Sequence, residues 1–170
     1  MKRPSKTAKP TRAAPRPSAR LLAGDLAQVR AIAATANVRA SSPRKALLFS
    51  GANAMTAAEL LAKRLERELY RVDLSTVVSN DIGETEKNFG RIFAEATAAG
   101  AILLFDEADA LFGQRTGVKD SHDRYSNIEI GYLLQRAEAY DGSVILASKL
   151  ELTLSIALRR RIAVYDFPPR

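Results

Sequence analysis

Short apolar runs alternate with longer helix-like stretches from residue 46 to the end of the chain. The apolar runs predict buried strands at 46–49, 69–74, 101–105, 144–147 and 162–167. Between them, apolar residues recur every three or four positions, which predicts amphipathic helices at 56–69, 84–98 and 125–140. Strands that alternate with helices of about 10 to 15 residues are typical of a parallel sheet with helices on both faces. The pattern therefore predicts an α/β fold of three layers, whose ligands bind at the carboxyl ends of the strands.

Two segments of different character precede this alternating region. Apolar residues at helical spacing, from Leu22 to Ala33, predict one amphipathic helix within 21–39, which Ser41-Ser42-Pro43 ends. Residues 1–20 contain four prolines, no aromatic residue and no acid, so they cannot form a core and are predicted to be disordered. The sequence thus divides into a basic, proline-rich tail at 1–20, a helix and linker at 21–43, and a globular core at 44–170.

The charge of the chain is concentrated in the tail. The formal net charge of the 170 residues is +7, and the tail alone holds seven lysines and arginines. The remaining 150 residues carry 19 basic and 19 acidic side chains, so the core is neutral. The tail is therefore either a solvated segment or an arm for nucleic acid, an acidic partner or a membrane surface.

Composition argues against several classes of protein. No apolar run approaches the roughly 18 residues that span a bilayer, and the first 20 residues contain no apolar block typical of a signal peptide. We therefore expect a soluble protein that is not exported. The chain has no cysteine and one histidine, His122, which argues against disulfide scaffolds, thiolate zinc sites and the usual histidine-activated nucleophiles.

The most informative motif is an apolar strand that runs directly into acids. Residues 101–105 are followed by Asp106, Glu107 and, two residues on, Asp109. Two adjacent carboxylates at a buried strand tip are unfavourable unless a cation or hydrogen-bond donors meet them. In a nucleotide hydrolase, the first acid helps to hold Mg²⁺ and the second takes the proton of an attacking water. The alternative is a polar strand exit that happens to be acidic.

Several segments follow one another in the order found in a known family. They are the strand and turn 46–51, the strand 69–75, the helix start 82–88, the acidic strand 102–112 and the Asp120-Ser-His-Asp-Arg124 segment. Across these segments, from residue 44 to about residue 168, the chain resembles the core of AAA-type ATPases, in particular a bacterial group with a Ser-His-Asp-Arg-Tyr segment after the acidic strand.

The resemblance implies a P-loop NTPase-like fold, with ATP bound between the first strand and the next helix. It places Asp106 of the Walker B strand near Mg²⁺ and makes Glu107 the base for the attacking water. Family members work as rings, often hexamers, that remodel protein partners. The resemblance also implies a cytoplasmic setting.

The phosphate-binding loop departs from the family pattern. The Walker A pattern G-x-x-x-x-G-K-[ST] supplies backbone amides and a lysine to the phosphates and a hydroxyl to Mg²⁺. The sequence from Gly51 to Glu59 lacks the second glycine and the lysine, and is about three residues shorter than the pattern requires. Gly51 and Thr56 remain candidate nucleotide-binding residues, and Thr56 a candidate Mg²⁺ ligand with Asp106. Thr56 and Glu59 also have the spacing of a helix capping box, which is the preferred interpretation of Thr56.

Basic residues stand at two further positions to which the resemblance gives a role. Lys149 lies where the family usually has a polar sensor residue, and is either a partial electrostatic substitute near the γ-phosphate or a solvated lysine. Arg159, Arg160 and Arg161 lie where arginine fingers reach a neighbouring subunit's nucleotide. The register does not assign the finger to one of the three, and an exposed basic cluster without that role is the alternative.

Three functions are compatible with these residues. The resemblance implies ATP binding and hydrolysis coupled to protein remodelling. The departures in the loop and at Lys149 favour a pseudo-ATPase that acts as a structural or regulatory ring partner, in a homo- or hetero-oligomer. The chain stops at Arg170, where family members continue into a helical lid, so we expect the lid to be missing. A third hypothesis is nucleic-acid binding through the tail.

Overall fold

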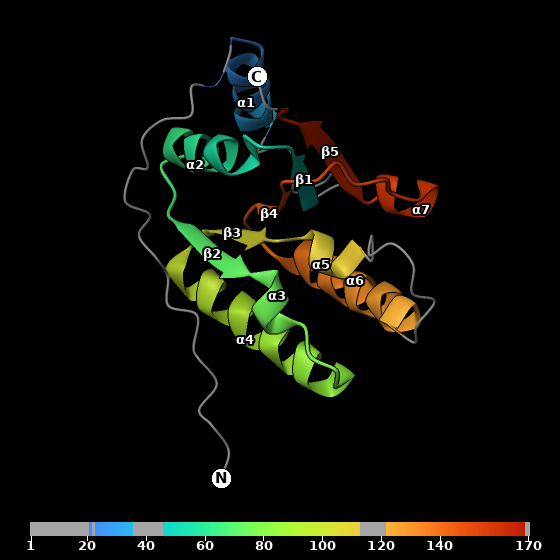
Figure 1. The fold of residues 1–170 in the computed structure, drawn as a ribbon. Helices are drawn as coiled ribbons and strands as arrows, with labels where there is room; N and C mark the ends of the chain where they lie inside the picture. Colours follow the sequence, from blue (N-terminus) through green and yellow to red (C-terminus); the bar gives the residue numbers. More distant parts are fainter. Residues whose placement is uncertain (1–20, 22, 36–45, 113–121, 169–170) are drawn as a thin grey trace.

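A five-stranded parallel sheet lies between two helical layers (Figure 1). The computed structural model describes residues 21, 23–35, 46–112 and 122–168, and within α6 it describes side chains from Ile128 onward. The strand order is β2-β3-β4-β1-β5, and every neighbouring pair is parallel. The strands are β1 Ala46–Ser50, β2 Leu69–Asp73, β3 Ile102–Asp106, β4 Val144–Ser148 and β5 Ile162–Asp166.

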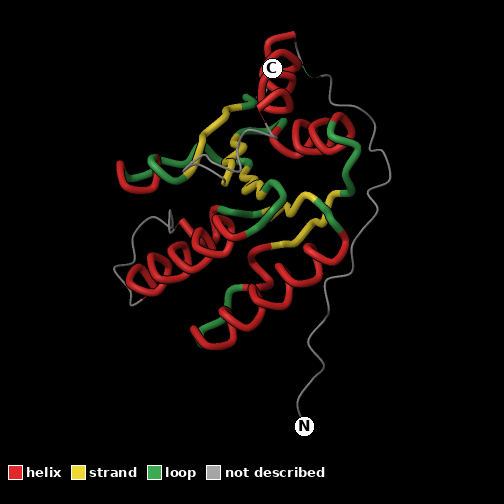
Figure 2. Tube along the Cα trace, turned by 180° about the vertical axis from the view of Figure 1, so that it is seen from behind, coloured by secondary structure: helices red, strands yellow, loops and turns green. Residues whose placement is uncertain are grey.

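Helices cover both faces of the sheet, as the sequence predicts. On one face, α1 (Ala23–Thr35) and α2 (Ala54–Arg64) pack on the apolar residues of β1, β3 and β4. On the other, α4 (Ile82–Ala99) and α6 (His122–Ala139) cover the opposite side chains of the strands, together with the short helices α3 (Leu74–Val77) and α5 (Asp109–Phe112). A further short helix, α7 (Ile156–Arg159), precedes β5. Figures 1 and 2 show the two layers from opposite sides, and the three-layer α/β prediction is confirmed.

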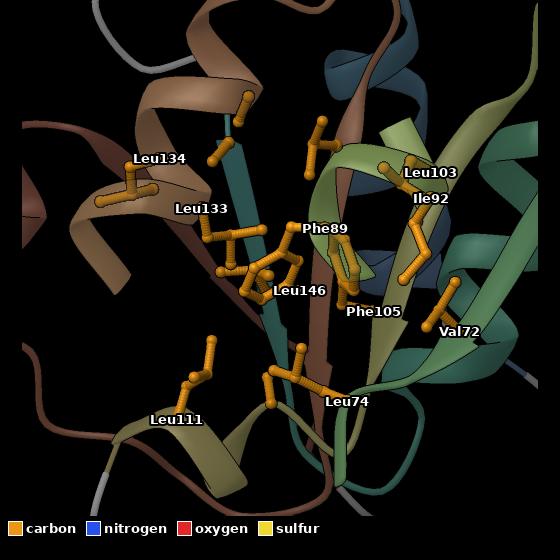
Figure 3. Packing of buried hydrophobic residues seen from close by; sticks show 14 of the residues in the cluster. Val72, Leu74, Phe89, Ile92, Leu103, Phe105, Leu111, Leu133, Leu134 and Leu146 are labelled. Atoms are coloured by element: carbon orange, nitrogen blue, oxygen red, sulfur yellow. The ribbon is translucent and has the colours of Figure 1, made fainter. Parts of the chain in front are cut away.

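Aromatic side chains fix the strands that carry the polar tips. On the α4 face, the Phe89 ring meets the Phe105 ring edge-on with centroids 5.7 Å apart (Figure 3). On the α2 face, Phe49 and Phe167 lie 5.0 Å apart. All four side chains are fully buried. The ends of β1, β3 and β5 are therefore held by the two apolar cores.

The predicted elements differ from the observed ones mainly at helix boundaries. The helix predicted at 56–69 spans Ala54–Arg64, because Glu66 takes a left-handed conformation and Arg67 N bonds back to Ala62 O. Three helices of four residues, α3, α5 and α7, were not predicted, since one turn shows no apolar period. The predicted tail at 1–20, the helix end at 41–43 and most of the Ser-His-Asp-Arg-Tyr segment lie outside the described residues or side chains.

The described helices include none with the length and apolar character needed to cross a membrane.

Candidate functional site

The polar ends of β1, β3 and β4 meet at one edge of the sheet. Gly51 N donates to Ser148 O at 2.9 Å, and Ala108 N donates to Ala147 O at 3.0 Å. From β1 the chain crosses through α2 to the far edge strand β2, whereas from β4 it passes β1 to reach β5. Ligands of open parallel sheets bind where the direction of winding reverses in this way. This edge of the sheet is therefore the candidate site, and ligand binding there stays a prediction.

The loop after β1 is short and is tied to the chain that leaves β5. Gly51 has φ +100, and a Cβ there would lie 2.3 Å from Phe167 O, so only glycine fits. Asn53 N donates to Phe167 O and Asn53 Nδ2 donates to Pro168 O, both at 3.1 Å. In return, Phe167 N donates to Ser50 O at 2.7 Å. The loop is thereby closed against the segment that follows β5.

The same bonds use the amides of the loop. Those of Gly51, Asn53 and Ala54 donate to the carbonyls of Ser148, Phe167 and Gly51, respectively. A phosphate-binding loop works by directing its free backbone N–H groups at the ligand. Three of the N–H groups in this loop are instead paired within the protein.

Thr56 does not cap α2, which corrects the preferred interpretation of this residue. The helix begins at Ala54 and its N-cap is Asn53, so Thr56 lies inside the first turn. The short loop leads into the helix two residues earlier than expected. Asn53 makes no side-chain cap bond, because its amide group is directed to Pro168. No hydrogen bond joins Thr56 to Asp106 in the described part of the chain, and their pairing as metal ligands remains a prediction.

The tip of β3 holds Asp106 in a close ion pair. Arg71 Nη2 lies 2.6 Å from Asp106 Oδ2, and the two side chains are 30% and 16% exposed. The other oxygen, Oδ1, accepts a hydrogen bond from Glu107 N at 2.9 Å. Arg71 comes from β2, where it lies opposite Leu104 and two residues before the strand tip. Sequence reasoning missed Arg71, whose only signal was a charge inside a short strand.

Glu107 follows with an unusual backbone and an unengaged carboxylate. Its φ of +58 is left-handed, a conformation that costs a non-glycine residue about 1 kcal/mol or more. Among the described residues, none forms a hydrogen bond or ion pair with its side-chain carboxylate. The residue is half-buried beside the paired Asp106.

At the tip of β4 the inward polar group is Ser148, and Lys149 points outward. The buried Ser148 hydroxyl donates to Asp109 Oδ1 at 3.3 Å and accepts from Leu150 N at 3.1 Å. Lys149 is exposed, and in the described part of the chain it forms no ion pair. Its role near a γ-phosphate stays a prediction, beside the alternative of a solvated lysine.

The three arginines near α7 differ in their contacts. Arg159 Nε donates to Leu154 O at 3.3 Å, and Arg161 Nη2 pairs with Glu138 Oε1 at 2.8 Å. Arg160 is exposed, and no described residue holds its guanidinium. Of the three, Arg160 is the one whose guanidinium forms no hydrogen bond or ion pair with a described residue.

A parallel sheet in this order, with a glycine turn at the tip of β1 and acids at the tip of β3, defines an α/β domain of the P-loop NTPase-like class. A family model described as "ATPase family associated with various cellular activities (AAA)" matches residues 55–168. The chain belongs to the AAA family. The matched range begins inside α2, so β1 and its loop lie before it.

Two curated relatives agree with this assignment. An "Uncharacterized AAA family ATPase y4kL" of Sinorhizobium fredii is 30% identical over 121 residues, 69% of this chain and 37% of the relative. The "ATPase family gene 2 protein" of Schizosaccharomyces pombe is 30% identical over 122 residues, 69% of this chain and 15% of the relative. The chain thus spans well under half of either relative.

The residues present do not fit Mg²⁺-ATP as the family pattern would bind it. The lysine of the phosphate loop is absent, and three of the loop's amides already donate to carbonyls of the protein. The carboxylate assigned to Mg²⁺ by the resemblance has a guanidinium on one oxygen and an amide on the other. No group of three or more possible ligands among His, Cys, Asp and Glu occurs in the described part of the chain.

Proposed function

We propose that this chain is a non-hydrolysing AAA domain that acts as a structural or regulatory partner in an oligomeric ring. The observation that carries the proposal is the closed loop after β1. There the backbone amides of Gly51, Asn53 and Ala54 donate hydrogen bonds to carbonyls of the protein itself and are not directed at a ligand. A lost charge-assisted contact such as that of the missing lysine weakens binding by about 1.5 to 3 kcal/mol, or about 10- to 150-fold. The paired amides add to this loss.

Features near α7 support a role in assembly. Ile156 is 75% exposed and Leu150 is 53% exposed, and both lie in the segment between the tip of β4 and the end of α7. Arg160, four residues after Ile156, is exposed and has no partner among the described residues, so it suits contact with an anionic group of a neighbouring subunit. We therefore extend the proposal to a ring in which this chain contributes Arg160 to a neighbour, in a cytoplasmic setting as the resemblance implies.

The first test is calorimetric titration of the purified 170-residue chain with Mg²⁺-ATP, alongside a steady-state phosphate-release assay. We expect no binding up to millimolar ATP and no release above that of a Glu107→Gln variant. Glu151→Gln, an exposed acid after β4, serves as the matched control. Micromolar binding, with turnover that is lost in Glu107→Gln and retained in Glu151→Gln, would overturn the proposal.

That second outcome defines the alternative function, an active ATPase that remodels protein partners. One observation favours it, namely that the Glu107 carboxylate has no described partner on a left-handed backbone, as a catalytic base held ready for water would. We rank it second because a base without a phosphate site has no substrate to act on.

Nucleic-acid binding through residues 1–20 stays a separate hypothesis from the sequence. Deleting these residues should abolish any salt-sensitive binding to DNA or RNA. Nucleic-acid binding that survives the deletion would assign the binding site to the core at 44–170 and not to the tail.

A further inference from the structure

We infer that Arg71 takes the place of a divalent cation at the tip of β3, so that this domain holds its acid pair without metal. The inference deepens the proposed function, because it accounts for the second half of the site, and it can be tested without ATP. It starts from the disagreement between the cofactor of the family and the partners that Asp106 has in this chain.

The first step is electrostatic. A carboxylate at a largely buried strand tip is stable only with a cation or with donors. Asp106 has both, from Arg71 Nη2 at 2.6 Å and Glu107 N at 2.9 Å. The need that a bound metal would meet is therefore met by the chain.

The second step is competition for space. Mg²⁺ binds oxygen at about 2.0 to 2.1 Å and requires near-octahedral geometry. A metal on Asp106 would lie within a few ångströms of the guanidinium, and two cations at that distance repel each other strongly in a partly buried site. A metal could enter only after Arg71 had moved away.

The third step concerns the sheet. Arg71 and Asp106 lie on the same face of adjacent parallel strands, since Arg71 is opposite Leu104 and Asp73 is opposite Asp106. Asp73 is already engaged, because its Oδ1 accepts from the amide and the hydroxyl of Ser75 at the start of α3. Arg71 is thus positioned by the strand register and is directed to Asp106 rather than to the nearer acid of its own strand.

The test uses Mn²⁺ alone, titrated into the full chain and followed by electron paramagnetic resonance of the free ion. Wild type and Asp106→Asn should bind Mn²⁺ equally weakly. Arg71→Gln should bind at least tenfold more tightly, whereas Arg71→Lys, which keeps a cation, should behave as wild type. Arg161→Gln is the matched control, because it removes an ion pair of the described part of the chain, that with Glu138, on a different part of the surface.

Two results would overturn the inference. One is Mn²⁺ binding by wild type that is lost in Asp106→Asn, a comparison that holds even if Arg71→Gln does not fold. The other is a folded Arg71→Gln variant that binds no more tightly than Arg161→Gln. ATP binding by wild type that is equal in Mg²⁺ and in a chelator would contradict the closed phosphate loop on which the proposed function rests, while leaving this inference intact.

Discussion

The tips of β1 and β3 are neighbours in the site but are stabilised in different ways. At β1, backbone groups pair with backbone groups of the segment after β5, and a glycine allows the close approach. At β3, the charge of Asp106 is met by one side chain, that of Arg71, and the Glu107 carboxylate has no partner among the described residues. The first tip has become part of the scaffold, because it cannot open without breaking its own hydrogen bonds. The second tip can change its contacts when a single side chain moves, since Arg71 alone neutralises the charge of Asp106.

The largest effect should come from breaking the β1 tip. Gly51→Ala places a Cβ against Phe167 O and forces an unfavourable positive φ, so we expect a loss of at least about 3 kcal/mol in the free energy of unfolding. Urea denaturation measures it. The control is Gly131→Ala in α6, where the new methyl meets nothing within 4 Å and should stabilise by up to about 1 kcal/mol. A loss below about 1 kcal/mol in Gly51→Ala would mean that the closed loop is not a fixed feature.

Breaking the β3 tip should cost less stability, because a single ion pair, that of Arg71 and Asp106, is lost. Arg71→Gln and Asp106→Asn should each lower stability by about 1.5 to 3 kcal/mol, because each leaves a charge that is partly buried and unpaired. The double variant should be about 1 to 2 kcal/mol less destabilised than the sum of the two. The more exposed pair Arg161 and Glu138 should give a coupling below about 1 kcal/mol in the same urea assay. If the coupling energies of the two pairs were equal, the pair of Arg71 and Asp106 would contribute no more than an ordinary surface ion pair.

Strand β2 offers a third comparison, because Tyr70 and Arg71 engage acids on opposite faces of the sheet. The Tyr70 hydroxyl donates a hydrogen bond to Glu95. Burial, as the largest cause, together with this hydrogen bond and the negative charge of Glu95, raises the pKa of Tyr70 to about 12. Since the folded pKa is raised above the ordinary 10, the stabilisation is complete below pH 10 and is lost as the pH rises towards 12. As the pH rises from 9 to 11.5, the free energy of unfolding should therefore fall by up to about 2 kcal/mol more in wild type than in Tyr70→Phe.

Urea unfolding of both proteins at the two pH values measures this difference. Burial also raises the pKa of Tyr140, which remains in both proteins and cancels from the comparison. Parallel losses in the two proteins would show that the Tyr70 hydroxyl titrates normally.

The sequence predicted the elements well because each depends on local pattern. The five strands were found within two residues, since each is a short apolar run, and the long helices show the helical period. The convergence of the tips of β1, β3 and β4 at one edge followed from the parallel sheet alone.

The contacts that decide the chemistry were not predictable, because they join residues far apart in the sequence. The partner of Asp106 lies 35 residues earlier, and the pairing depends on the register of β2 against β3. The acceptor of the Asn53 side chain lies 115 residues later, beyond β5. The error at Thr56 has the same origin, since a capping-box spacing carries no information about the carbonyls that hold Asn53 at the helix start.

The smallest predicted effect concerns backbone strain at two non-glycine residues with positive φ, and whether the side chain at either position has a structural role. Glu66 and Glu107 both have left-handed backbones, with φ of +51 and +58. Glu66 follows α2 as an ordinary helix end, so Glu66→Gly should stabilise the protein by about 0.5 to 1 kcal/mol. Glu107→Gly should relieve the same strain and add a similar amount, because no described contact of its carboxylate is lost. Differential scanning calorimetry compares the two, with exposed Glu68→Gly, which lacks a positive φ, as the destabilised control. A destabilised Glu107→Gly would reveal that its side chain supports the β3 tip, and the contrast between a scaffold tip and an exchangeable one would then have to be redrawn.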